Sequence, residues 1–181
     1  MISVRPAHIR DLGTVLDWLN KEDIWRLDSP EPYTRRTRQQ FAPQWQTLVD
    51  GGTAFIIEFR GRPVGHMGWV RHTEELGEFY IVIGETDAWG LGIGRSAMEA
   101  LFRLAAGRGL AGLFGRVLGN NPRALAFFRK MGFTPCGHTR NYFTRDQQSF
   151  DLHWVKRSLK PADPGPQLNA ADPVGVELSE G

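Results

Sequence analysis

The sequence is poor in cysteine and has no long apolar run. Cys136 is the single cysteine among 181 residues, which excludes an intrachain disulfide, and no CxxC or HExxH pairing suggests a metal site. Nowhere do about eighteen uncharged apolar residues run together, and the first residues lack an apolar signal-peptide core. We therefore expect no metal, no membrane span and a cytoplasmic protein.

The composition indicates one globular domain followed by a tail. Hydrophobic residues make up 41% of the chain and charged residues 23%, which is typical of globular proteins. Residues 161–181 are rich in Pro, Gly, Ala and Asp and have few large apolar side chains to offset the entropy of ordering. We predict a folded domain over 1–160 and a disordered tail over 161–181.

The predicted domain carries a net positive charge, whereas the predicted tail is acidic. The tail contains four acidic residues and no Lys or Arg, so residues 1–160 hold 22 basic and 16 acidic side chains, a net charge of +6. Such a field suits a polyanionic ligand. Because the basic residues form no clustered stripe, we expect neither nucleic acid nor a membrane as a partner.

Apolar periodicity predicts helices and strands in a mixed order. Three strands in the middle of the chain, joined by short turns, indicate an antiparallel meander. The segment 20–33, with Pro30 and Pro32, is predicted to be a loop. Predicted helices cover about 8–20, a stretch from about 34 that is interrupted or kinked at Pro43, 95–107 and 121–131; predicted strands cover 2–7, 53–60, 63–72, 77–84, 111–119 and two last strands around a turn at 145–148.

A glycine-rich stretch, "WGLGIG", lies between a strand and a helix. Glycines at 90, 92 and 94 leave the backbone N–H groups of the helix start open, and the helix dipole favours an anion there. A P-loop would need GxxxxGK, and a dinucleotide-binding fold would need GxGxxG in a parallel βαβ unit, so neither is supported. The remaining alternatives are a phosphate-binding turn and a turn that only permits close packing.

Two motifs at the right separation resemble the GCN5-related N-acetyltransferase (GNAT) family. The family's phosphate turn, Q/R-x-x-G-x-G/A, is matched at Gly92 and Gly94, with Trp89 in place of Gln or Arg, as in the ribosomal-protein N-terminal and polyamine acetyltransferase branch. The second motif, N-x-x-A-x-x-x-Y-x-x-x-G-F, is matched within "NNPRALAFFRKMGF" by Asn121, Ala124, Gly132 and Phe133.

The resemblance implies a mixed α/β (α+β) fold, with a mostly antiparallel twisted sheet of about seven strands flanked by about four helices. It implies acetyl-CoA as co-substrate and direct attack by an amine on the thioester in a ternary complex. It also implies that the strand ending at Gly84 splays from the next strand and frees backbone groups. The cofactor-binding residues expected on this basis are Ile81, Val82, Ile83, Trp89, Gly90, Leu91, Gly92, Ile93, Gly94, Arg95, Asn121 and Phe128.

The general base is predicted from its place on that strand. Glu78 lies three residues before Ile81, where a carboxylate could take a proton from the amine directly or through water. A solvated strand glutamate is the alternative reading of Glu78. Glu85, His66 and His72 are weaker candidates for the same role.

The general acid presents a difficulty. Phe128 occupies the family's tyrosine position and has no proton to give. Tyr142 is our candidate substitute, although a packed aromatic with a bonded hydroxyl is an alternative role for it. A thiolate can also leave unprotonated, since a thiol pKa near 8.5 makes it a moderate leaving group.

The acceptor is expected between the 20–33 segment and the last hairpin, by the same resemblance. The segment carries four acidic residues, Asp28 among them, which suit a cationic acceptor such as a polyamine, an aminoglycoside or a peptide N-terminus. A solvated acidic loop is the alternative. The missing tyrosine also leaves open a non-catalytic acyl-CoA-binding module, and Trp or Phe on the last strands suggests a homodimer.

Overall fold

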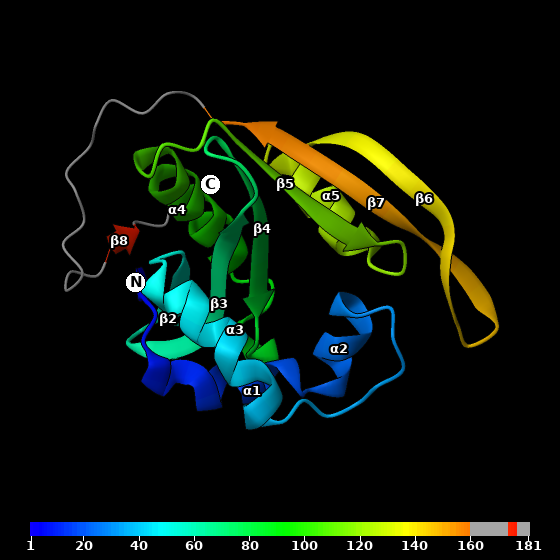
Figure 1. The fold of residues 1–181 in the computed structure, drawn as a ribbon, viewed down its shortest axis with the longest axis horizontal. Coiled ribbons are helices and arrows are strands. Elements are labelled where there is room, and N and C mark those ends of the chain that lie inside the picture. Colours follow the sequence, from blue (N-terminus) through cyan, green and yellow to red (C-terminus); the bar gives the residue numbers. More distant parts are fainter. Residues whose placement is uncertain (160–173, 177–181) are drawn as a thin grey trace.

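The computed structural model describes residues 1–159 and 174–176 of the chain (Figure 1). The helices are α1 (Leu12–Leu19), α2 (Glu22–Asp28), α3 (Arg38–Asp50), α4 (Ile93–Gly107) and α5 (Pro122–Lys130), with 3-10 turns η1 (Ile9–Asp11) and η2 (Thr86–Ala88). The strands are β1 (Ile2–Pro6), β2 (Ala54–Phe59), β3 (Arg62–Arg71), β4 (Leu76–Ile83), β5 (Gly112–Leu118), β6 (Thr134–Arg145), β7 (Gln148–Ser158) and β8 (Val174–Val176).

The strands form one mixed sheet in the order β6-β7-β5-β4-β3-β2-β1-β8. All neighbouring pairs are antiparallel except β4 and β5, which run parallel. The mixed fold with a mostly antiparallel sheet is therefore confirmed, with a fifth helix and a short eighth strand beyond the predicted numbers. Apart from β8, the predicted tail lies outside the described residues.

Helices cover both faces of the sheet, and the side chains of β4 point alternately toward the two helical layers. Phe79 belongs to the larger core, where α4 and α5 pack, and Ile81 and Ile83 pack against that core. Tyr80 and Val82 point the other way, against the smaller core made with α1 and α3. Because successive strand side chains alternate between faces, β4 contributes to both layers.

The prediction of a loop over 20–33 is wrong for its first part. Residues Glu22–Asp28 form α2, whose first turn carries Glu22 and Asp23 at the positive end of the helix. Ile24 and Trp25 are buried, so the helix is stabilised by tertiary packing that a short sequence pattern does not reveal. Pro30 and Pro32 follow α2 and lie in the connection to α3.

The predicted interruption at Pro43 is also wrong, because α3 continues from Arg38 to Asp50 with Pro43 inside it. A capping box at the start of this helix stabilises it. The Thr37 hydroxyl accepts from the Gln40 N–H at 3.3 Å, and the Gln40 side chain accepts from the Thr37 N–H at 2.9 Å.

The parallel pair β4 and β5 separates after a few residues. Its register runs from Leu76 opposite Gly112 to Glu78 opposite Phe114 and ends there. Figure 1 shows the two strands diverging below this point, with α2 between their lower ends. The edge of β4 from Phe79 to Ile83 thus has no β5 partner, as the sequence analysis expected.

Candidate active site

A cavity of about 420 Å³ opens where β4 and β5 diverge. Its wall combines β4, the glycine turn, the start of α5 and the end of α2. All predicted cofactor-binding residues line it except Leu91, which is 50% exposed. Its volume lies within the range of roughly 300–1,000 Å³ common for small-molecule sites.

The glycine turn places a helix start at the cavity. Gly90 has φ +82° and Gly92 has φ +76°, in the left-handed region that glycine adopts without a Cβ penalty. Gly92 is the N-cap of α4, and no side chain caps this helix end. The N–H groups of Ile93, Gly94 and Arg95 therefore have no intrahelical acceptor, and all three residues line the cavity.

Basic side chains flank this helix start. Arg95 lines the cavity and pairs with Glu99 one turn later at 3.1 Å. Arg123, on the first turn of α5, also lines it and lies over the Trp89 ring at 5.4 Å. Our sequence analysis missed Arg123, although its place directly after Asn121 and Pro122 was a usable signal.

Trp89 has a structural contact that explains its place in the turn. Its indole N–H donates to the Ile83 carbonyl at 2.9 Å. This bond satisfies the last carbonyl of β4 and ties the turn to the strand. The same ring forms part of the cavity wall.

The second motif also reaches the cavity. The Asn121 side chain accepts from the Ala124 N–H at 3.1 Å and caps α5. Phe128 is buried and packs edge-on against Phe79, with ring centroids 5.0 Å apart. Both residues line the cavity.

Glu78 lies outside the cavity wall and is engaged in an ionic cluster. Its carboxylate accepts from the Arg116 Nε at 2.6 Å and lies 3.1 Å from the His72 Nε2. Its side chain is 19% exposed. Two cationic or donor groups therefore already occupy the carboxylate that we predicted as the base.

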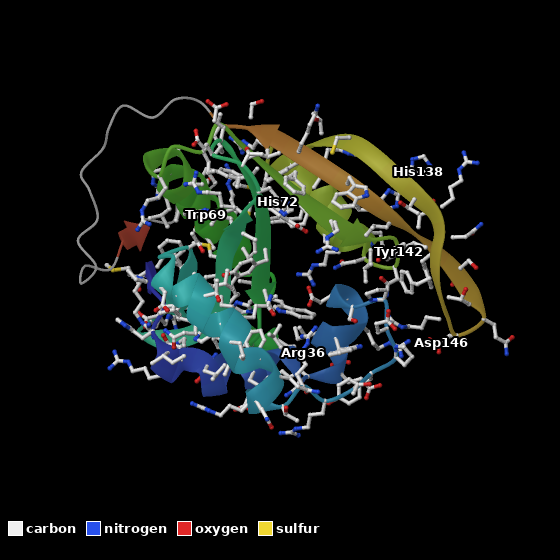
Figure 2. All side chains as sticks on the ribbon, in the orientation of Figure 1. Arg36, Trp69, His72, His138, Tyr142 and Asp146 are labelled. Carbon is white, nitrogen blue, oxygen red and sulfur yellow. The ribbon has the colours of Figure 1, made fainter. Side chains whose placement is uncertain are left out.

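The other predicted candidates also lie apart from the cavity wall. Tyr142 is 43% exposed on β6 (Figure 2). Glu85 accepts from the Trp18 indole at 2.7 Å and from Lys21 at 3.1 Å, and these bonds lower the pKa of its carboxyl. His66 is buried, and desolvation lowers the pKa of its ring to about 3.

Asp28 is the one acidic side chain that lines the cavity among the described residues. Asp28 is an exposed residue at the cavity, and many protein atoms lie around its carboxylate. This desolvation raises the pKa of the carboxyl, against the opposing positive charges of Arg36 and Arg116. The sequence analysis named Asp28 only as one of four loop acids.

The end of α2 is anchored by distant residues. The Asn120 side chain donates to the Arg26 carbonyl at 2.7 Å. Arg145, at the tip of the β6–β7 hairpin, donates to the carbonyls of Arg26 and Ser29. The neighbouring Asp146 pairs with the Arg26 side chain, and Figure 2 shows Asp146 at the hairpin end beside α2.

The described residues contain no group of three or more His, Cys, Asp or Glu placed to hold a metal ion. Within the same residues, no helix has the length and apolar character needed to cross a membrane.

The free edge of β4 and the uncapped, glycine-rich start of α4 thus meet at one cavity. The model of the acetyltransferase (GNAT) domain matches residues 2–134. The chain therefore belongs to the GNAT acetyltransferase family, and the predicted resemblance is confirmed.

The curated relatives include a mycothiol acetyltransferase from Amycolatopsis mediterranei. It is 36% identical over 101 residues, which cover 51% of this chain and 34% of the relative. The matched part thus spans about a third of that protein's length.

Solved structures with similar folds include two acetyltransferases with bound cofactor. A phosphinothricin acetyltransferase from Sinorhizobium meliloti, in complex with AcCoA, has a TM-score of 0.77 at 18% identity, covering 92% of this chain and 93% of that one. A spermidine N-acetyltransferase from Vibrio cholerae, in complex with CoA and spermine, has a TM-score of 0.75 at 16% identity, covering 87% and 95%. At these identities the likeness shows the fold.

Proposed function

We propose that this protein transfers an acetyl group from acetyl-CoA to a primary amine, by direct attack in a ternary complex. The observation that carries the proposal is the convergence of two features on one cavity, namely the open start of α4 and the unpaired edge of β4. The first suits a pyrophosphate and the second suits an extended amide chain.

The pyrophosphate is assigned to the glycine turn. The N–H groups at the start of α4 point toward one region, and the positive end of the helix dipole favours an anion there. Side chains at Gly90 and Gly92 would project into the approach to this backbone. Arg95 and Arg123 supply positive charge on either side.

The pantetheine arm and the thioester are assigned to the unpaired edge of β4. In a strand, successive N–H groups point to opposite edges, so N–H and C=O groups between Phe79 and Ile83 face the gap that β5 leaves. They could pair with the amides of the pantetheine as a strand would. One N–H near Ile81 would donate to the thioester oxygen as negative charge develops on it.

The departing thiolate needs no protein acid in this proposal. Phe128 lies in the wall at the family's tyrosine position, and Tyr142 lies outside the wall. A thiol pKa near 8.5 allows the thiolate to leave and collect a proton afterwards. Tyr142 as acid and Glu78 as base stay predictions that substitution to Phe and Gln would test.

The acceptor is proposed to be a cationic small-molecule amine or a peptide N-terminus. The acidic residue in the cavity wall supports this class. The family neighbours named for spermidine or phosphinothricin act on amines of different shape, which leaves the individual acceptor to experiment. A cytoplasmic location and a homodimer are part of the same proposal.

Thermal unfolding with single ligands tests the cofactor assignment before any acceptor is known. Acetyl-CoA and CoA should raise the melting temperature, while NADH and ATP should leave it unchanged. A ligand at a hundredfold its dissociation constant adds about 2.7 kcal/mol to the free energy of unfolding. An equal shift with NADH, or none with either CoA species, would contradict the proposal.

A non-catalytic acyl-CoA-binding module is the second candidate, favoured by Phe128 at the tyrosine position. Thiol release from acetyl-CoA should be followed with spermidine, glucosamine and an alanine-initiated peptide. Release with any of them supports the enzyme. Tight acetyl-CoA binding with no release across a wide amine panel supports the module.

A further inference from the structure

Asp28 is placed where an acceptor amine would approach the thioester. It lies at the last turn of α2 and lines the same cavity as the unpaired edge of β4. The cavity wall contributed by α2 is otherwise apolar, with Ile24 and Leu27. A cationic amine that enters from this side therefore meets one carboxylate.

Glu78 is less suited to accept a proton. Its carboxylate already accepts from Arg116 at 2.6 Å and lies 3.1 Å from His72, and it lies outside the cavity wall. These contacts hold the carboxylate in the ionic cluster with Arg116 and His72, away from the cavity. For Asp28, by contrast, no hydrogen-bond donor from the described residues occupies the carboxylate.

The position of Asp28 is fixed by bonds to the backbone on both sides of it. Asn120 and Arg145 donate to the Arg26 carbonyl, and Arg145 donates also to the Ser29 carbonyl. Arginine that binds the last carbonyls of a helix stabilises that end. Asp28 is thus held between two anchored peptide groups rather than on a free loop end.

We propose that Asp28 is the catalytic residue that binds the acceptor ammonium and removes its proton. This inference rests on the proposed acetyl transfer and names the base for it. The charged groups that act on the Asp28 carboxylate are the cationic Arg36 before α3 and Arg116 on β5. They lower the pKa of this carboxyl, while desolvation, the larger effect, raises it.

The ammonium gives one proton to Asp28, and the freed lone pair forms the N–C bond at the thioester carbonyl. The C–S bond breaks with its electron pair on sulfur. The second nitrogen proton is then released to the thiolate, giving the amide and the CoA thiol, and Asp28 returns its proton to solvent.

The test compares Asp28→Asn with Asp23→Asn and Glu78→Gln. Asp23 is an exposed acid in the first turn of the same helix and outside the cavity wall, so it controls for loss of charge on α2. Thiol release from acetyl-CoA is measured with spermidine, glucosamine and an alanine-initiated peptide. Acetyl-CoA affinity is measured by calorimetry for every variant.

We expect Asp28→Asn to lower kcat/KM by roughly 10²-fold or more, because general base catalysis contributes on that scale. The acid limb of its pH profile should flatten, and Asp28→Glu should restore part of the rate. Asp23→Asn should stay within about twofold of the unsubstituted protein, as expected for an exposed charge. Acetyl-CoA affinity should be the same in all variants.

An Asp28→Asn variant that keeps the full kcat/KM and the acid limb of the pH profile would overturn the assignment. Loss of the rate and of the acid limb in Glu78→Gln would identify Glu78 as the base instead. Acetyl-CoA binding without turnover of any of the three amines would also count against Asp28. Absence of acetyl-CoA binding in the unsubstituted protein would instead overturn the proposed function.

Discussion

The two sides of the cavity differ in how far apart their residues lie along the chain. The side proposed to bind the cofactor comes largely from one continuous stretch, Ile81 to Arg95, in which a strand runs through a turn into a helix. The acceptor side depends on α2, which is held by Asn120 and Arg145, residues 94 and 119 positions from Arg26. A local motif therefore builds the first side, and the packing of remote elements builds the second.

This difference predicts which changes act locally. A substitution in the glycine turn should change the affinity for acetyl-CoA alone. A substitution at the hairpin tip should change only the reaction with the acceptor amine.

Gly92→Glu should abolish tight acetyl-CoA binding. A carboxylate at the start of α4 would lie where the phosphates are proposed to bind, and like charges placed together cost several kcal/mol, so the dissociation constant should rise by roughly 10²-fold or more. Calorimetric titration with acetyl-CoA measures it.

The matched control for Gly92→Glu is Gly61→Glu. Gly61 has φ +77° in the β2–β3 turn, and a Cβ there meets nothing within 4 Å. Both variants carry similar backbone strain, so Gly61→Glu should lose stability but keep its affinity for acetyl-CoA. Equal affinities in the two variants would rule out the phosphate assignment.

The buried His66 ring should make the free energy of unfolding fall at acid pH. The ring is buried among Trp18, Trp45 and Tyr80, and neither nitrogen has a hydrogen-bond partner among the described residues. Its pKa is about 3 in the folded chain, below the ordinary value of 6.5, because burial disfavours the charged ring. The unfolded chain therefore binds a proton between these values that the folded chain does not.

The stability that His66 contributes is fully present above about pH 6.5 and falls as the pH drops toward 3. At pH 5 the loss should be about 2 kcal/mol of unfolding free energy, and His66→Phe should remove most of this slope. Urea unfolding at pH 7 and pH 5 measures it, with the exposed His138→Asn as control. A slope unchanged by His66→Phe would show that other groups are responsible.

Arg145→Ala should lower kcat/KM and leave the dissociation constant for acetyl-CoA unchanged. The carbonyls at the end of α2 would lose the bonds that hold Asp28 in place, and misplacement of a reacting group should cost roughly tenfold in kcat/KM. Arg140→Ala, an exposed arginine on the same strand, should have no such effect. A rise in the acetyl-CoA dissociation constant of Arg145→Ala would contradict the division of the cavity into two sides.

Phe128→Tyr should have the smallest effect. If the thiolate leaves without a protein acid, adding the hydroxyl should change kcat by less than roughly threefold, far below the 10²-fold scale of required acid catalysis. Steady-state rates at pH 7 and pH 9 measure it. A tenfold rise in kcat would mean that protonation of the departing thiolate limits the rate of the unsubstituted protein.

Tertiary contacts explain what the sequence did not reveal about Glu78, Tyr142 and α2, and the catalytic roles of Glu78 and Tyr142 stay predictions. Glu78 was selected for its place on β4, but its partner Arg116 is 38 residues away, and only the pairing of β4 with β5 brings them together. Tyr142 was selected as an available hydroxyl, but its strand carries it to an exposed position. Helix α2 was missed because its stability comes from burial of Ile24 and Trp25.

The sequence by itself determined the features that depend on neighbours in the chain: the meander, the helix starts at Gly92 and Asn121, and hence the family and the cofactor side. Backbone geometry and capping act over a few residues, so a single stretch is enough to specify them. Only the tertiary structure decided which carboxylate lines the cavity. Asp28 and Glu78 are both acidic in sequence, but the surroundings that leave one open to the cavity and pair the other with Arg116 exist only after the sheet has formed.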